Sequence, residues 1–209
     1  MFIFVNSYLE KQADFFKDSP INWHGLDLSE EMLNRAEDRL DKVNLVKADV
    51  VDMPYQAKTF DFICNNYAFH YYINKEKTIS EIYRVLIDGG TYKLHNISIH
   101  DMPNWWLYHY FPTAFYQDLK RYWTKETIFH ELNSRGFQVN LRVEYSMQHI
   151  KLHDYIEHVE NRDISVLTLI DDECYTEGLS RMKADIKRNP EKTIINDFAE
   201  LFCIAVKTS

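Results

Sequence analysis

The stretch from Ile21 to Leu94 alternates short apolar runs with amphipathic segments, and this alternation leaves few folds open. Apolar runs at Ile21–Leu26, Val43–Asp49 and Phe60–Asn66 have the length of strands. The third run is apolar over most of its length, as expected for a strand buried on both faces. A helix capped by Ser29 and a helix over 75–86 lie between and after these runs. Strands that alternate with helices predict βαβ units and a mostly parallel sheet.

The rest of the 209-residue chain departs from this alternation. A helix is expected over Phe4–Phe16, before the first of the three strands, with Val5, Tyr8, Leu9 and Phe16 near one face. After Leu94 we expect an aromatic-rich segment at 102–123, a helix at 125–134 and a strand at 137–145. A mixed but mostly helical segment at 154–188 and a last strand at 199–207 complete the chain as we expect it. No repeat or linker interrupts the chain, so we expect a single domain over 1–209 with inserts at about 102–123 and 151–190.

Two of the predicted strands end in an acid. An aspartate at the tip of a strand, directly before a helix, usually holds the hydroxyls of a ribose, and Asp27 stands in this position. Asp49 stands at the end of the next strand. Either residue could instead make a local turn, which is a common use of aspartate. A glycine-rich loop should precede Asp27 by about 20 residues, but the first glycine of the chain is Gly25.

Three stretches together resemble the class I S-adenosylmethionine-dependent methyltransferases, in particular the small-molecule branch typified by ubiquinone and menaquinone biosynthesis enzymes. They are "GLDLSEEML", "VKADVVDMPYQAKTFDFICNNYAFHYY" and "EIYRVLIDGGTYKL", which run in unbroken order from Gly25 to Leu94. The resemblance implies an α/β, Rossmann-like, mostly parallel sheet with helices on both faces and an antiparallel last strand. It also implies S-adenosylmethionine as cofactor and methyl transfer to a small-molecule acceptor.

The resemblance also implies which residues bind the cofactor. Asp27 matches the acid that bonds the ribose, and Leu28 would pack near the adenine. Asp49 matches the acid that accepts from the adenine amino group, and Val50 would cover the ring. Each aspartate keeps its alternative as a turn residue.

A second set of matches falls after the third strand. Asn65 and Asn66 stand where the strand tip meets the methionine part of the cofactor, and His70 matches a histidine that is frequent just after that tip. The asparagines could instead be loop residues that form hydrogen bonds, and His70, inside "YAFHYY", could be a packed histidine.

The chain departs from the family pattern at its beginning. The family's first strand and its G-x-G-x-G loop have no counterpart, because the loop would fall at or before the first residue. We therefore expect the N-terminal strand to be missing and the sheet to lack a central member. The turn over Asp88–Gly90 also replaces the usual Pro-Gly-Gly; we expect it to end the preceding helix with a glycine in the left-handed conformation.

Composition excludes several other classes of function. The net charge of −8 argues against a broad phosphate-binding face and so against nucleic acid as a partner. Three widely separated cysteines indicate buried thiols and not a disulfide or zinc framework, and the nine histidines show no metal spacing. We expect no leader peptide and no membrane span, and a cytoplasmic location.

The chemistry of methyl transfer requires few side chains, because the sulfonium is already activated. A base is needed only when the acceptor must lose a proton. His95, His100 and His109 are candidates for this base, and each could instead be an ordinary packed residue. No catalytic residue is assigned. The aromatic segment at 102–123 is a lid over an apolar or aromatic acceptor, a separate small core under a helical insert, or an interface that covers the incomplete sheet. A homo-oligomer also stays open.

Three functions therefore stay open from the sequence. The first is a small-molecule methyltransferase. The second is a non-catalytic domain of the same fold that serves as a binding or scaffold module, which the missing glycine loop favours. The third is a nicotinamide-dependent oxidoreductase, which the unit of strand, acid and helix also permits, although it needs a glycine-rich loop as well.

Overall fold

The computed structural model describes residues 1–4, 7–40 and 43–209, and these form two compact units. The first unit consists of Met1–Asn96, Lys125–Arg142 and Leu201–Ser209, and the second of Ile97–Thr124 and Val143–Glu200. The expected single domain over 1–209 stays a prediction. None of the helices in the described residues is long and apolar enough to cross a membrane.

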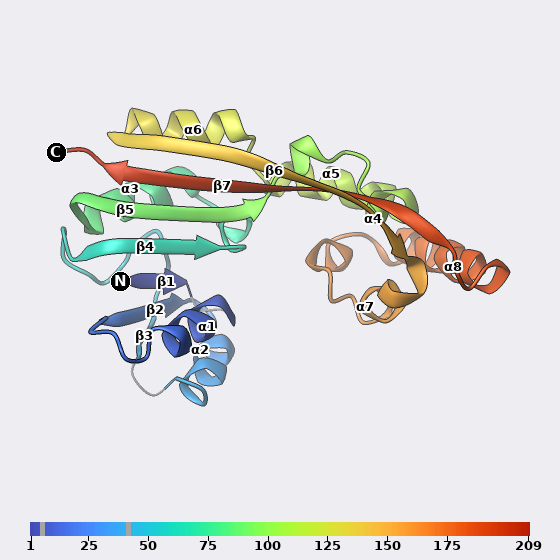
Figure 1. Cartoon of the computed structure of the whole chain (residues 1–209), viewed down its shortest axis with the longest axis horizontal. Helices are drawn as coiled ribbons and strands as arrows, with labels where there is room; N and C mark the ends of the chain where they lie inside the picture. The colour runs from blue at the N-terminus through green and yellow to red at the C-terminus, as the bar shows by residue number, and fades with distance from the viewer. Residues whose placement is uncertain (5–6, 41–42) are drawn as a thin grey trace. The chain divides into compact units, whose positions relative to one another are not determined.

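A seven-stranded sheet runs through the described residues, in the order β3-β2-β1-β4-β5-β7-β6 (Figure 1). Its strands are β1 (Phe2–Phe4), β2 (Trp23–Asp27), β3 (Val43–Lys47), β4 (Phe60–Asn66), β5 (Leu86–Ile97), β6 (Phe137–Lys151) and β7 (Thr193–Lys207). The ladders from β3 through β5 are all parallel. The arrow of β7 runs opposite to that of β5 in Figure 1, so the predicted antiparallel last strand is confirmed.

The prediction that the N-terminal strand is missing is wrong. Phe2–Phe4 form β1, which lies in the middle of the sheet and pairs in parallel with His24–Leu26 of β2 and with Ile63–Cys64 of β4. The error arose because "FIF" is so short that it reads equally well as the start of the following helix. That helix, α1, spans Ser7–Phe15 and is shorter than expected; Val5, assigned to its apolar face, lies outside the described residues.

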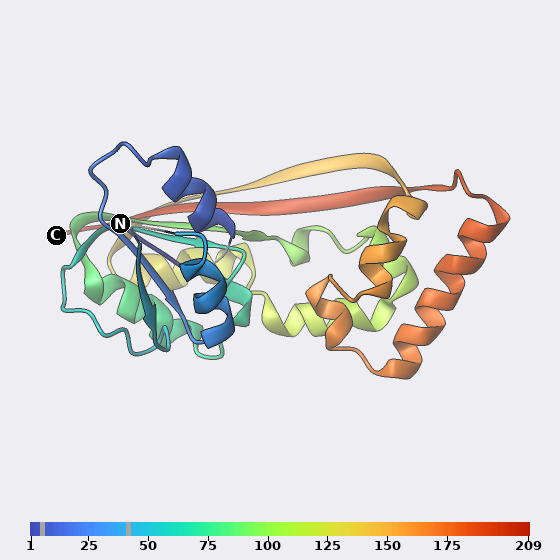
Figure 2. The same ribbon diagram turned by 90° about the horizontal axis from the view of Figure 1, so that it is seen from below.

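Helices cover both faces of the sheet in the first unit. They are α1, α2 (Glu30–Glu37), α3 (Lys75–Val85) and α6 (Lys125–Ser134). Figure 2 shows α1 and α3 on opposite sides of the strands. The predicted cap of α2 is confirmed, since the Ser29 side chain accepts from the Met32 N–H at 3.3 Å. Acidic side chains in the first turn also suit the positive end of the helix dipole.

Apolar side chains fill the space between these layers. On the α1 and α2 side, Leu9 and Leu33 pack with Trp23 and Cys64 of the strands. Within α3, the buried side chains include Ile82, which is fully shielded from solvent. The Lys207 Nζ of β7 donates at 2.8 Å to the carbonyl oxygens of both Tyr83 and Leu86, where α3 passes into β5.

The end of α3 differs from the expected one. The helix ends at Val85 and β5 begins at Leu86, so the Asp88–Gly90 turn lies inside the strand and does not close the helix. Gly89 does adopt the left-handed conformation, with φ of +77°, which glycine tolerates at no steric cost. Gly89 therefore has the expected left-handed conformation, but inside β5 and not at the end of α3.

The second unit is built around the aromatic-rich segment. Its helices are α4 (Trp106–Tyr110), α5 (Pro112–Arg121), α7 (Ile156–Glu160) and α8 (Asp172–Arg188). Six of the aromatic side chains in the segment are buried in one cluster: Trp105, Trp106, Tyr108, Tyr110, Phe111 and Tyr122. The alternative of a separate small core is thus what the structure shows for these side chains, and a lid over the acceptor stays a prediction.

Candidate functional site

A cavity of about 510 Å³ opens at the carboxyl ends of β2 and β3 in the first unit. Its wall consists of Leu26, Asp27, Leu28, Ala48, Asp49, Val50, Val51, Ala68, Tyr71, Tyr72, Ile73 and Asn74. Parallel sheets bind ligands outside the carboxyl ends of their strands, at the point where the strand order reverses. Here the order reverses at β1 and β4, so this cavity lies where the topology predicts a ligand site.

Asp27 is the last residue of β2 and part of the cavity wall. Its Oδ1 accepts from the Ser29 N–H at 2.8 Å, which ties the carboxyl group to the start of α2. Burial raises the pKa of this carboxyl above its usual value, while hydrogen bonds from the backbone N–H groups of Ser29 and Leu28 oppose the rise. A partly desolvated carboxylate fixed at a strand tip is a strong acceptor for sugar hydroxyls.

Asp49 and its neighbours Ala48, Val50 and Val51 form another part of the wall. The Asp49 Oδ1 accepts from the Val51 N–H at 3.1 Å, so this aspartate makes the turn that the sequence left open as an alternative, and it also lines the cavity. Val50 is buried, while the Leu28 side chain is 64% exposed. These two apolar residues flank the carboxylates and offer surface to a flat ring.

The other three predicted residues lie outside the cavity wall. Asn65 is fully buried; its Nδ2 donates to the Tyr72 hydroxyl at 3.0 Å, and its Oδ1 accepts from the Ala68 N–H at 3.2 Å. Because Tyr72 and Ala68 line the cavity, Asn65 supports the wall without facing it. Cofactor contact by Asn65 stays a prediction.

Asn66 and His70 contact polar partners on β5. The Asn66 Oδ1 lies 2.8 Å from His95 Nδ1, and His70 Nδ1 lies 3.2 Å from the Asn96 Oδ1. His70 is 6% exposed, as expected for the packed histidine of the alternative interpretation. Direct cofactor contact by these two residues also stays a prediction.

The connection from β4 to α3 supplies wall residues that the sequence reasoning missed. Tyr71, Tyr72 and Ile73 follow His70 directly, and Asn74 both lines the cavity and caps α3 by accepting from the Lys77 N–H at 2.9 Å. Burial raises the pKa of the Tyr72 phenol well above its usual value, so this phenol stays protonated. The aromatic run directly after the end of β4 is the sequence signal that could have identified them.

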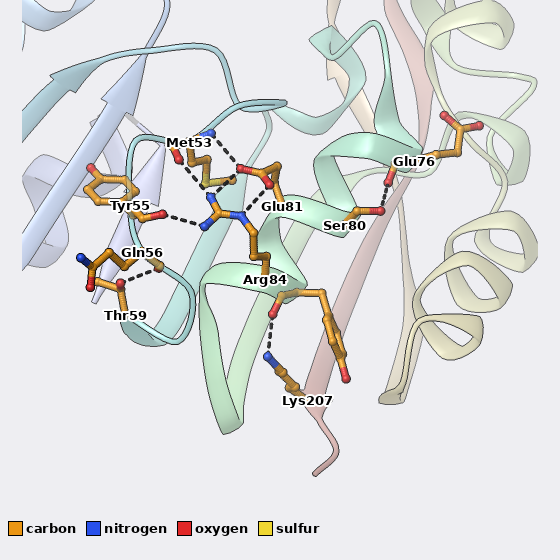
Figure 3. Close-up of polar contacts among 10 residues, drawn as sticks. Met53, Tyr55, Gln56, Thr59, Glu76, Ser80, Glu81, Arg84 and Lys207 are labelled. Carbon is orange, nitrogen blue, oxygen red and sulfur yellow. Dashed lines mark hydrogen bonds and ion pairs between the residues drawn. The ribbon is translucent and has the colours of Figure 1, made fainter.

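The loop behind the Asp49 wall is held by Arg84 of α3 (Figure 3). Its guanidinium donates to the carbonyl oxygens of Tyr55, at 2.7 Å, and Met53, at 3.0 Å. It also pairs with Glu81 through two bonds of 2.7 Å, and Glu81 in turn accepts from the Met53 N–H at 2.9 Å. One ion pair on α3 therefore fixes the path of the chain that follows the wall residues 48–51.

We expect the Arg84–Glu81 ion pair to make the free energy of unfolding depend on pH in the acidic range. The hydrogen bond from Arg84 lowers the pKa of the Glu81 carboxyl, although burial opposes the shift. Because the folded-state pKa is the lower one, the pair stabilises the fold above the unfolded-state pKa of about 4.3, and this stabilisation is lost as pH falls through the folded-state pKa. Urea unfolding of Glu81→Gln should therefore show a shallower loss of stability below about pH 4.5 than the parent chain; parallel curves would contradict this.

The three histidines considered as bases have different surroundings. His100 Nε2 donates to the Tyr122 carbonyl oxygen at 3.0 Å, and the His109 ring makes an edge contact with Tyr110. Both belong to the second unit and contact its core. His95 belongs to the first unit and lies at the carboxyl end of β5, next to β4.

The segment between β1 and α1 contains Val5 and Asn6, which lie outside the described residues. The glycine-rich loop was expected at or before the first residue, but because β1 is present the loop would instead follow it here, and no glycine is present in this segment. Among the described residues, no group of three or more His, Cys, Asp or Glu side chains is arranged to hold a metal ion.

Comparison with known proteins supports the same fold. Residues 8–94 match the model of a methyltransferase domain. The chain is 30% identical over 70 residues to the ubiquinone/menaquinone biosynthesis C-methyltransferase UbiE of Campylobacter jejuni, covering 34% of this chain and 30% of that protein. It is 32% identical over 116 residues to the chloroplastic 2-methyl-6-phytyl-1,4-hydroquinone methyltransferase 1 of Oryza sativa, covering 54% and 33%. The chain thus spans about a third of the length of these curated relatives.

A solved structure extends the likeness to the whole chain. Phosphoethanolamine N-methyltransferase 2 of Haemonchus contortus, solved with S-adenosylhomocysteine, aligns with a TM-score of 0.57 and 18% identity. The alignment covers 100% of this chain and 48% of that one. At this identity the likeness establishes the fold, which agrees with the α/β, Rossmann-like sheet expected from the sequence.

Proposed function

We propose that this chain, whose residues 8–94 carry a methyltransferase domain within the class I fold, binds S-adenosylmethionine and transfers its methyl group to a small-molecule acceptor. The observation that carries the proposal is the cavity at the carboxyl ends of β2 and β3, with Asp27 in its wall. Two features support a role for Asp27: its position as the acid at the end of β2, and its place in the cavity wall.

The residues of the cavity fit the adenosine part of the cofactor. The Asp27 carboxylate would accept from the ribose hydroxyls, and Asp49 would accept from the adenine amino group. Val50, Leu28 and the half-exposed ring of Tyr71 would cover the faces of the adenine. The wall thus combines mostly apolar side chains with a few polar groups, as is usual for a cofactor site.

The charge of the wall separates this cofactor from a dinucleotide. Its two ionisable carboxyl groups belong to Asp27 and Asp49, and no lysine or arginine is among the described wall residues. Carboxylates favour a cationic ligand and repel a pyrophosphate, which normally needs a glycine-rich loop and a helix N-terminus. The nicotinamide-dependent oxidoreductase is therefore the weaker candidate.

The bound cofactor would supply an already activated methyl group. The residues of the chain would hold the cofactor, orient the acceptor and exclude water, and such positioning provides most of the rate gain in this chemistry. The name of one curated relative places it in ubiquinone and menaquinone biosynthesis, and the name of the other states a hydroquinone as its substrate. By extension, we propose an apolar or aromatic acceptor for this chain.

Calorimetric titration of the chain with S-adenosylhomocysteine, with NAD as the control ligand, tests the proposal. We expect a dissociation constant in the micromolar range for S-adenosylhomocysteine and no measurable heat of binding for NAD. A folded chain that binds neither ligand would contradict the proposal and favour a non-catalytic module. Binding of NAD alone would favour the oxidoreductase.

A further inference from the structure

Three side chains of different chemistry meet at the carboxyl ends of β4 and β5. Asn66 is the last residue of β4, Tyr67 follows it, and His95 lies beside Asn66 in the parallel register of β5. The Asn66 Oδ1 lies 2.8 Å from His95 Nδ1, and the Tyr67 hydroxyl lies 3.1 Å from His95 Nε2. An amide, an imidazole and a phenol are therefore linked in a row.

The amide oxygen fixes the direction of this row. An amide oxygen can only accept, so His95 Nδ1 carries the proton that it donates to Asn66. His95 Nε2 is then left with its lone pair and accepts from the Tyr67 hydroxyl. A hydroxyl that donates to an imidazole, which is itself oriented by a third group, is the arrangement that activates hydroxyls in enzyme sites.

The imidazole is held in place from its face as well as from its edge. The ring of Phe202, on β7, stacks on His95 with 4.2 Å between centroids and 16° between planes. The Arg142 guanidinium of β6 lies 5.0 Å from the centre of the same Phe202 ring. Packing and hydrogen bonds together restrain the orientation of the His95 ring, as a group that transfers protons requires.

The backbone at Tyr67 is strained. Its φ is +52°, in the left-handed region that a tyrosine rarely occupies. The strain is offset by the Tyr67 N–H, which donates to the His95 carbonyl oxygen at 2.9 Å. Such strain persists where the surroundings impose it, and it concentrates at functional sites. Here it holds the phenol over His95 while leaving the side chain 37% exposed.

The position in the sheet connects this row to the cofactor cavity. Asp27 lies on one side of the reversal in strand order, and Asn66 and His95 lie on the other. Ala68, which follows Tyr67 directly, is part of the cavity wall. A ligand whose adenosine contacts Asp27 and whose reactive end crosses the reversal point would thus bring that end toward the strand tips that carry Tyr67.

We propose that Tyr67 is the catalytic residue that takes the proton from a hydroxyl group of the acceptor, and that His95 receives the proton of Tyr67 in the same step; this inference rests on the proposed function. The acceptor oxygen forms a bond to the methyl carbon as the carbon–sulfur bond breaks, and that bond's electron pair stays on sulfur. The acceptor proton moves to the Tyr67 oxygen while the Tyr67 proton moves to His95 Nε2. The imidazolium then releases a proton to water. Asn66 is the positioning residue, and the acceptor class is a phenol or a similarly acidic hydroxyl compound.

The test uses the whole chain and a series of para-substituted phenols, from 4-methoxyphenol to the more acidic 4-nitrophenol. With labelled S-adenosylmethionine, we expect Tyr67→Phe and His95→Gln to lower kcat about 100-fold for 4-methoxyphenol and less than about 10-fold for 4-nitrophenol, which ionises without help. Asn66→Ala should lower kcat less, and Asn66→Asp should restore it. Tyr145→Phe, which removes the hydroxyl of a phenol that is 63% exposed on β6 in the second unit, is the matched control.

A second readout does not depend on turnover. With S-adenosylhomocysteine present, the parent chain should bind 4-nitrophenol at pH 6.5 with an increase in phenolate absorbance, and Tyr67→Phe and His95→Gln should abolish the increase. Equal losses of kcat across the phenol series, or a chain that binds S-adenosylhomocysteine but neither methylates nor ionises any phenol, would overturn the inference. Failure to bind S-adenosylhomocysteine at all would instead refute the proposed function.

Discussion

Replacing Asp27 with alanine is expected to raise the dissociation constant for S-adenosylhomocysteine about 100-fold. The carboxylate would accept from two ribose hydroxyls, and hydrogen bonds to a charged group contribute about 1.5–3 kcal/mol each. A net loss of about 2.7 kcal/mol corresponds to two factors of ten in affinity. Calorimetry at fixed pH and salt measures the change directly. The Asp27 side chain accepts from the Ser29 N–H, which water can satisfy after the substitution, so the fold should survive.

Two further variants make the Asp27 result specific. Asp27→Asn keeps an oxygen for Ser29 but removes the charge, so its affinity should fall between those of Asp27→Ala and the parent chain. Asp14→Ala removes an exposed carboxylate from α1, away from the cavity wall, and should leave the affinity unchanged. Equal affinities for all three variants would show that Asp27 does not contact the ribose.

Replacing Arg84 with alanine is expected to lower the free energy of unfolding by about 3 kcal/mol. The substitution leaves the Met53 and Tyr55 carbonyl oxygens and the Glu81 carboxylate without their shared donor. A group whose partner is removed loses its hydrogen bonds and still bears part of its cost of desolvation. Urea unfolding followed by circular dichroism measures the change. The affinity for S-adenosylhomocysteine should fall a few-fold as well, because the loop from Asp49 loses its support.

The chain contains a matched control for Arg84. Arg35 also pairs with a glutamate of its own helix, Glu31, at 2.6 Å, but these side chains are 65% and 73% exposed. Arg35→Ala should therefore change the free energy of unfolding by less than about 0.5 kcal/mol. Arg84→Lys should restore only part of the stability, because one ammonium cannot replace the planar fork of a guanidinium. A loss for Arg84→Ala no larger than that for Arg35→Ala would show that the loop does not depend on this ion pair.

The sequence predicted correctly those helices and strands whose ends are marked by residues within or next to the element itself. The helix at Lys125–Ser134 and the strand at Phe60–Asn66 have the predicted bounds, because each combines a clear apolar pattern with polar residues at its ends. The three residues of β1 could not be recognised in this way. Their pairing with β2 and β4 depends on partners that are far away in the sequence, and three residues are too few to show a period.

The same difference explains the candidate site. Asp27 and Asp49 were recognisable because a strand end followed by a polar residue is a local pattern, and both line the cavity. Asn65 and Asn66 were predicted to act alike, but successive residues of a strand point to opposite faces. One therefore bonds to Tyr72 and the other to His95. Contacts such as that of Arg84 with Met53 join residues that are far apart in the sequence, so no local sequence pattern predicts them.

The short β1 also has a consequence for how the sheet is assembled. The β3-β2 pair and the β4-β5 pair each form between segments that are close in sequence, whereas β2 and β4 are not neighbours in the sheet. Among the described residues, the β ladder therefore passes from one half to the other through Phe2–Phe4. Closing the long loop between β1 and β4 costs chain entropy before any bond forms. Phe2–Phe4 thus join the two halves of the sheet. We expect each half to form early in folding, and the full ladder to close only when β1 pairs with both halves.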